Sequence, residues 1–365
     1  MKYGLVFAGG GARGAYHVGV MHALNEMNIE ISAVCGTSIG AINGALFVQD
    51  GGENARELWE DVTLNDIVKL PEGMGNNLLS LSNLTEIIGG LKNGGFDAAP
   101  LEKMLRKYID EDKIRKSETD FGLVSVSLTN KKTVRLFKND IPHGKLPEYL
   151  AAGAALPVFK NKEIDGERFM DGGISDNMPV DMLADKGIKD IITVDIHGVG
   201  IKQDVCTAGT NIIEIVCESP IVGTMEFDRQ GISDTVDMGY YDTKKVFGYF
   251  SGSRYYFETG QYNNLKRQYG IKLIEGLEQA AEIFGIKRFK LYDFKEFARE
   301  TLARYRNFSE KNMLEALRSE AAGAAVIHMI NLLKDGKNEF IRKKLDIFGK
   351  YYNAAGSLMY FERIF

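Results

Sequence analysis

The sequence predicts an α/β fold with a mainly parallel central sheet, and three observations support this prediction. Short apolar runs alternate with helical patterns through about the first 250 residues. The first two runs end in glycine-rich loops, and the connections between units are short. A chain that alternates strand and helix in this way normally builds parallel strands covered by helices.

The first two strand–helix units carry the clearest pattern. Residues 3–8 are apolar and lead into a glycine cluster, as expected for a first strand. The helix that follows places apolar side chains on one face, at Val18, Met21, Leu24 and Met27. Residues 31–35 are the second expected strand, and the small residues of 41–48 form the second helix.

The remaining strands are expected at residues 121–128, 133–137, 189–196 and 211–216. A turn at Asn130-Lys131 separates the first two of these. Ahead of them, Asp97 is expected as the N-cap of a helix that has Pro100 in its first turn and runs to about Asp110.

Two regions stand apart from this alternation. Between Leu78 and Leu91 an apolar stripe lies in a glycine-flanked segment, which we interpret as a lid or an interfacial surface, with an ordinary packed helix as the alternative. From residue 251 onward the patterns become long and helical, at 273–284, 294–305 and 313–333, which predicts a helical accessory region over 251–365.

Composition excludes several classes of protein. Hydrophobic residues make up 44% and charged residues 26%, so the chain can bury a core, and its net charge of −5 does not favour nucleic acid as a partner. Three cysteines, Cys35, Cys206 and Cys217, lack metal-type spacing and favour reduced thiols in a cytoplasm. No apolar run approaches the roughly 18 residues of a spanning helix, so any membrane contact is expected to be peripheral.

A nucleophile motif lies between the second strand and the second helix. Residues 36–40 read G-x-S-x-G, which in this context predicts a sharp turn that exposes the Ser38 hydroxyl. The helix that follows favours negative charge at its N-terminus. The alternative is a serine that merely caps the helix.

The glycine run after the first strand is the second motif. Backbone amides of Gly9, Gly10 and Gly11 can converge on an oxyanion there, and Arg13 either orients the loop, meets an anionic head group or is simply solvated. The run also satisfies G-x-G-x-x-G, which is typical of dinucleotide-binding folds. That interpretation requires an acidic residue after the second strand, where Ser38 and its neighbours stand instead.

An aspartate follows a short strand-like segment at residues 167–170. Asp171-Gly172-Gly173 could be an ordinary turn, because aspartate often hydrogen-bonds to its own backbone. Its occurrence after a glycine loop and a nucleophile motif in one α/β chain favours a catalytic role.

Over about residues 1–250 the chain strongly resembles the patatin-like phospholipases. The resemblance is carried by residues 9–14, by residues 36–46, by Asp171-Gly172-Gly173, and by the flanking segments 151–157 and 175–179. It implies a three-layer patatin-like fold, with residues 1–250 as the catalytic domain. It also implies a Ser38–Asp171 dyad without histidine and an oxyanion hole at Gly9, Gly10 and Gly11, with Arg13 at the basic position of that loop.

One departure is Gly153, where many relatives carry serine; the resemblance makes this a packing position, so little functional loss is expected. A dyad agrees with the chemistry, since a serine alcohol needs a hydrogen-bonded base, and partial burial would raise the pKa of Asp171 toward a useful range. The five histidines, at positions 17, 22, 143, 197 and 328, could each provide a triad instead, although structural roles are favoured.

We therefore expect a cytoplasmic serine acyl hydrolase, a phospholipase A, lysophospholipase or esterase acting on phospholipid or other fatty-acyl esters. Acyl transfer to an alcohol and a non-catalytic lipid-binding scaffold are the alternatives. No metal and no cofactor is required by this chemistry, and the oligomeric state stays open.

Overall fold

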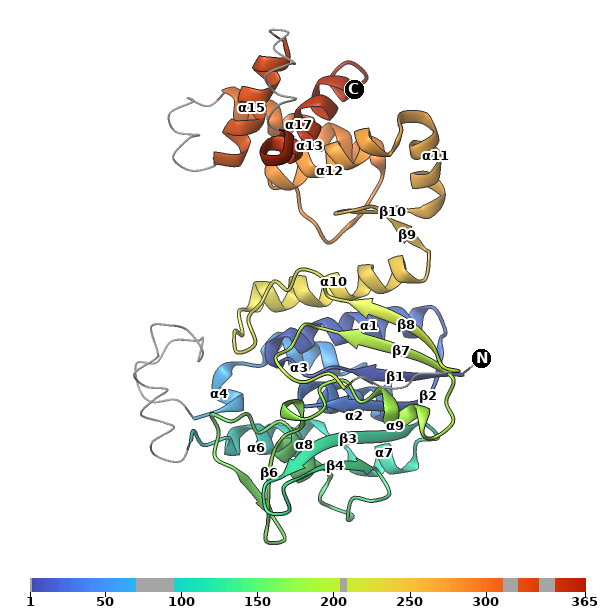
Figure 1. The fold of residues 1–365 in the computed structure, drawn as a ribbon, viewed down its shortest axis with the longest axis vertical. Helices are drawn as coiled ribbons and strands as arrows, with labels where there is room; N and C mark the ends of the chain where they lie inside the picture. The colour runs from blue at the N-terminus through green and yellow to red at the C-terminus, as the bar shows by residue number, and fades with distance from the viewer. Residues whose placement is uncertain (1, 70–94, 204–208, 311–320, 335–344) are drawn as a thin grey trace. The chain divides into compact units, whose positions relative to one another are not determined.

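The computed structural model describes residues 2–69, 95–203, 209–310, 321–334 and 345–365. The chain divides into two compact units, Met1–Thr243 and Lys244–Phe365, which are drawn in Figure 1. The apolar stripe between Leu78 and Leu91 lies outside the described residues, as does Cys206.

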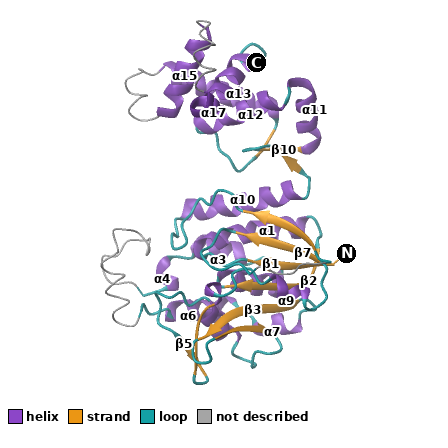
Figure 2. Ribbon diagram, in the orientation of Figure 1, coloured by secondary structure: helices purple, strands orange, loops and turns teal. Residues whose placement is uncertain are grey.

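The first unit is built on an eight-stranded sheet in the order β5-β6-β3-β2-β1-β7-β8, with β4 paired to β3. Its strands are β1 Lys2–Phe7, β2 Glu30–Thr37, β3 Asp120–Ser127, β4 Lys132–Phe137, β5 Lys162–Ile164, β6 Glu167–Asp171, β7 Asp190–Asp195 and β8 Asn211–Val216. Strands β3, β2, β1, β7 and β8 are neighbours in this order and pair in parallel. Strands β4 and β6 pair antiparallel with β3, and β5 pairs antiparallel with β6. The predicted α/β class and the mainly parallel sheet are confirmed (Figure 2).

Helices cover both faces of this sheet. Helix α2 (Ile39–Asp50) packs on one face, where Gly44 lies against Val34 and Phe121. Helix α9 (Val180–Ala184) packs on the opposite face, where it shares a buried cluster with Val6 and Cys35. The helices of this unit are α1 Ala15–Glu26, α2 Ile39–Asp50, α3 Ala55–Asp61, α4 Leu64–Ile67, α6 Ala99–Tyr108, α7 Glu111–Lys116, α8 Leu146–Gly153, α9 Val180–Ala184 and α10 Arg229–Val246, the last of which extends past Thr243.

The prediction that Asp97 caps helix α6 was wrong by one residue. Ala98 is the N-cap, and Asp97 lies just outside the helix. The Asp97 carboxylate still accepts a hydrogen bond from the amide of Ala99 at 2.9 Å, so it stabilises the helix start from one position earlier.

The second unit is mainly helical and has its own core. Its helices are α11 Thr259–Tyr269, α12 Ile271–Ile283, α13 Phe294–Glu310, α15 Ala321–Lys334 and α17 Leu345–Phe361, which bury an aromatic-rich cluster. Three short strands, β9 Phe250–Ser251, β10 Tyr256–Glu258 and β11 Leu291–Tyr292, form a small sheet that the helical pattern did not predict. Within the described ranges, no helix of either unit has the length and apolar character needed to cross a bilayer.

Candidate active site

Ser38 lies at the turn between β2 and α2, in a strained backbone conformation. Its φ and ψ are 56° and −126°, values that side-chain-bearing residues rarely adopt. The turn can be this tight because glycines stand two residues before and two residues after Ser38. A β-carbon at Gly40 would lie 2.2 Å from the Phe7 carbonyl oxygen, and one at Gly36 would lie 2.4 Å from the backbone of Gly40.

Strand register brings Asp171 to Ser38. Thr37 at the end of β2 pairs with Val124 of β3, and the next residue of β3, Ser125, pairs with Asp171 at the end of β6. The Ser38 hydroxyl then donates a hydrogen bond of 2.5 Å to Asp171 Oδ2. Two residues that are 133 positions apart are thus joined across three strands.

The Asp171 carboxylate is buried, with 3% of the residue exposed. Its Oδ1 accepts a hydrogen bond from the Gly173 amide at 2.7 Å. Burial raises the pKa of Asp171 to about 6, against the opposing effect of the hydrogen bonds from Ser38 and Gly173. The carboxylate is therefore a stronger base than an exposed aspartate.

The glycine loop lies beside Ser38 because β1 is the neighbour of β2 in the sheet. The amide of Gly9 donates to the Asn177 carbonyl at 3.2 Å, and the amide of Ala12 donates to the Thr224 carbonyl at 2.7 Å. In the part of the chain that the structure describes, no hydrogen bond occupies the amides of Gly10 and Gly11. Gly11 has φ +60°, and a β-carbon there would meet the Thr224 carbonyl oxygen at 2.0 Å, so only glycine fits.

Arg13 holds two loops together. Its guanidinium donates from Nη1 to the His197 carbonyl and from Nε to the Val222 carbonyl, the latter at 3.2 Å. Among the three roles expected for Arg13, these contacts support the role of orienting the loops.

Among the described residues of Met1–Thr243, none of the four histidines, at positions 17, 22, 143 and 197, hydrogen-bonds to Ser38 or Asp171. His17 follows the glycine run most closely along the chain, but it is fully buried, stacks on Phe7 at 4.5 Å between ring centroids, and pairs through Nδ1 with Asn43 at 3.2 Å. Burial lowers the pKa of His17 to about 3, so it stays neutral at physiological pH. Its contacts are those of a structural histidine.

An apolar pocket opens beside the nucleophile. Ser38 and Gly11 line one part of it. The rest is formed by aliphatic, aromatic and methionine side chains from α2, α3, α4, α6, the segment after α8 and the segment before α10: Ile39, Ile42, Leu58, Trp59, Val62, Ile67, Leu101, Met104, Ala154, Leu156, Phe159, Met225 and Phe227. Trp59 is held in place because its indole N–H donates to Asn43 Oδ1 at 3.0 Å. Such a lining suits a hydrocarbon chain.

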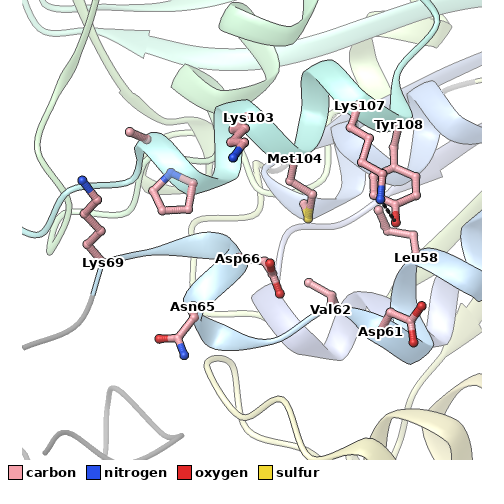
Figure 3. A pocket seen from close by; sticks show the side chains of 12 residues that line it. Leu58, Asp61, Val62, Asn65, Asp66, Lys69, Lys103, Met104, Lys107 and Tyr108 are labelled. Carbon is pink, nitrogen blue, oxygen red and sulfur yellow. Dashed lines mark hydrogen bonds between the residues drawn. The ribbon is translucent and has the colours of Figure 1, made fainter. Parts of the chain in front are cut away.

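A polar groove shares Leu58, Val62 and Met104 with this pocket. Figure 3 shows its two walls, with Lys103 and Lys107 on α6 facing Asp66 and Asp61 on the side of α3 and α4. Lys107 donates to the hydroxyl of its neighbour Tyr108 at 3.1 Å.

Sequence reasoning missed the part played by Asn177. Its carbonyl accepts from the Gly9 amide, its side-chain amide donates to the Gly9 carbonyl at 3.3 Å, and only 1% of the residue is exposed. It therefore clamps the glycine loop to the segment that follows Asp171. Gly153 is buried at the end of α8, where a β-carbon would lie 3.2 Å from the Val124 carbonyl oxygen, in keeping with a packing position.

Comparison with known proteins gives one family match, to a model described as patatin-like phospholipase, over residues 5–184. Among curated relatives, the human patatin-like phospholipase domain-containing protein 6 is 28% identical over 218 residues, which is 57% of this chain and 14% of the relative. A putative patatin-like phospholipase domain-containing protein of Caenorhabditis elegans is 28% identical over 194 residues, or 53% of this chain and 16% of the relative.

Lysophospholipase NTE1 of Cryptococcus neoformans is 28% identical over 199 residues, which is 54% of this chain and 11% of the relative. The chain thus matches less than a fifth of the length of these relatives. A crystal structure of VipD from Legionella pneumophila aligns over 98% of this chain and 90% of that chain, with 14% identity and a TM-score of 0.40.

Proposed function

Because residues 5–184 belong to the patatin-like phospholipase family, we propose that this protein is a serine acyl hydrolase that cleaves lipid esters through Ser38 and Asp171. The observation that carries the proposal is the 2.5 Å hydrogen bond from Ser38, which stands at a strained turn and is itself only 7% exposed, to a buried carboxylate. A serine alcohol is a weak nucleophile and needs such a base.

In the first half-reaction Asp171 accepts the Ser38 proton while Oγ bonds to the ester carbonyl carbon. The free amides of Gly10 and Gly11 donate to the oxyanion that forms. The intermediate then collapses, the alcohol leaves with the proton from Asp171, and the acyl group stays on Ser38. Gly9 contributes through loop position, because its amide is bound to Asn177.

In the second half-reaction a water molecule gives a proton to Asp171 and attacks the acyl-serine. Collapse of the second oxyanion breaks the bond to Oγ, and Ser38 recovers the proton from Asp171. A fatty acid is released. The same carboxylate acts as base and acid in both halves.

The substrate we propose is a phospholipid or another fatty-acyl ester, which makes the enzyme a phospholipase A, a lysophospholipase or an esterase. The apolar lining beside Ser38 supports an acyl chain in the pocket. We further propose that residues 1–250 form the catalytic domain and 251–365 an accessory region, and that the protein acts in the cytoplasm or at a membrane surface.

The test is hydrolysis of a series of chromogenic acyl esters by the wild type, Ser38→Ala and Asp171→Ala, together with fluorophosphonate labelling. We expect turnover in the wild type, loss in both variants, and labelling that depends on Ser38. Labelling with acyl release only to added alcohols would favour an acyltransferase. A wild type that neither turns over esters nor reacts with fluorophosphonate would be a non-catalytic scaffold.

A further inference from the structure

Four exposed apolar side chains lie on loops that adjoin the site. Among the described residues of Met1–Thr243, four large apolar side chains are exposed: Val199 at 90%, Ile201 at 55%, Ile174 at 41% and Ile221 at 38%. A few scattered apolar residues are normal on a protein surface, but contiguous ones mark an interaction site. We call these four residues the apolar rim.

The loops that carry the rim are joined to one another and to the catalytic residues. The Ile201 amide donates to the Gly173 carbonyl at 2.9 Å, and the Asn177 amide donates to the Ile201 carbonyl at 2.6 Å. The backbone at Ile201 therefore lies beside the segment that begins at Asp171 and contains Ile174.

Arg13 makes the second connection. By donating to the carbonyls of His197 and Val222, it ties the loop of Val199 to the loop of Ile221. Gly198 also packs so closely that a β-carbon there would lie 1.8 Å from the Gly9 carbonyl oxygen. The rim thus belongs to the same set of loops as the glycine run.

From these contacts we infer that the apolar rim inserts into the surface of a lipid bilayer and brings the site to its substrate. This inference rests on the proposed function, because a lipid ester must be taken from a membrane or aggregate. The apolar face of a protein element that lies on a membrane is buried at the boundary between head groups and acyl chains.

The charge of the rim favours a neutral, zwitterionic bilayer. The single lysine of residues 197–203, Lys202, forms an ion pair with Asp195. Attraction to anionic lipid relies on clusters of unpaired lysine and arginine. Binding through the rim should therefore depend on apolar contact and change little with salt.

The experiment measures sedimentation of the full chain with phosphatidylcholine vesicles, in a Ser38→Ala background so that lipid is not consumed. We expect this chain to bind, and Val199→Asn with Ile201→Asn to lower the partition coefficient by about 10- to 100-fold. Ile364→Asn, at a residue 45% exposed in the other unit, is the matched control and should leave binding unchanged.

A second variant, expected to increase binding, separates the effect of the apolar rim from loss of binding through misfolding. Val199→Trp should strengthen binding, because tryptophan partitions well into the membrane interface. Equal partitioning of the Asn double variant and the parent, no gain from Val199→Trp, or no binding of the Ser38→Ala chain would each overturn the inference, as would binding that disappears at high salt.

Failure of the inference and failure of the proposed function can be told apart. With Ser38 intact, the Asn double variant should hydrolyse a soluble short-chain ester at the wild-type rate and vesicle phosphatidylcholine much more slowly. If the Asn double variant hydrolyses both the soluble ester and vesicle phosphatidylcholine at the wild-type rate, the inference about the apolar rim is wrong and the proposed function stands. Absence of soluble turnover in the wild type refutes the hydrolase, whatever the vesicles show.

Discussion

Burial gives Asp171 two properties that act in opposite directions. Desolvation raises its pKa to about 6, which makes the carboxylate a better proton acceptor. The same desolvation makes the ionised form costly inside the fold. Activity and stability should therefore depend on pH in opposite ways, and both can be measured.

The rate should follow ionisation of the base. Below pH 6 Asp171 holds a proton and cannot accept one from Ser38, so kcat/KM for a soluble ester should rise with pH through about 6 and level off above it. His197→Asn is the control, because His197 lies next to the glycine loop with φ 49°, a conformation that asparagine tolerates. An altered profile in that variant would point to histidine as the titrating group.

Removing the charge should stabilise the fold. The Asp171 carboxyl ionises near 3.8 when unfolded and near 6 when folded, so its contribution to stability is complete below 3.8 and is lost as pH rises through 6. Asp171→Asn should therefore raise the free energy of unfolding at pH 7 to 8 by up to about 3 kcal/mol, while hydrolysis is lost. Urea unfolding at pH 4 and pH 8 tests this. A gain of the same size at both pH values would exclude the ionisation mechanism.

At the residue scale, the sequence pointed to the two residues of the proposed dyad and gave no signal for the residues that support them. Ser38 and Asp171 stand in local motifs, and the structure brings them together. Asn177 carries no local signal for its contact with Gly9, because that contact joins residues 168 positions apart. The sequence also does not predict that Val199 is exposed, because exposure depends on which residues lie near it in space.

The turn at Ser38 is the element on which the site depends. Its geometry requires that α2 begin directly against β1, with no β-carbon at Gly40. Gly40→Ala would place a methyl group 2.2 Å from the Phe7 carbonyl oxygen, which is backbone and cannot move aside. We expect a loss of several kcal/mol in stability and of fluorophosphonate labelling at Ser38.

The control for this prediction is a helical glycine with open space. Gly356 lies within α17, and nothing stands within 4 Å of a β-carbon there. Gly356→Ala should stabilise the protein by roughly 0.5–1 kcal/mol and leave hydrolysis unchanged. Thermal unfolding of both variants is the measurement, and a similar fall in Tm for the two would contradict the steric argument.

Elements with a strong local period were predicted well, and short ones were not. The strands of the parallel sheet are apolar runs bounded by turns, so their existence follows from the sequence. Strands β9 and β11 are two residues long and each pairs with β10, so they are too short to show a hydrophobic period in the sequence. The register across β2, β3 and β6 was likewise out of reach, since pairing between distant strands is set by the whole sheet.

At the scale of the whole molecule, the second unit has a polar centre of its own. Glu278 is fully buried on α12 and accepts hydrogen bonds from the amides of Ser253, Arg254 and Tyr255. Burial raises the pKa of Glu278, which the backbone donors oppose. One carboxylate thus fixes the segment between β9 and β10.

Glu278→Ala should therefore destabilise the second unit by about 1–3 kcal/mol or more, because it leaves several buried donors without a partner. Ester hydrolysis at 25 °C should persist, since Ser38 and Asp171 both belong to Met1–Thr243. Hydrogen exchange of the amides at 253–255 together with activity tests this. Loss of activity without faster exchange would show that Glu278 acts on the site by another route.

The position of Trp59 gives the protein an optical reporter of its own. It is the single tryptophan in 365 residues, it is buried beside Ser38 in the apolar pocket, and its indole is anchored to Asn43. Intrinsic emission excited at the indole band therefore comes from one site. An acyl chain that enters the pocket should shift or quench this fluorescence in the Ser38→Ala chain, so that affinity for lipids of any length can be titrated without a label.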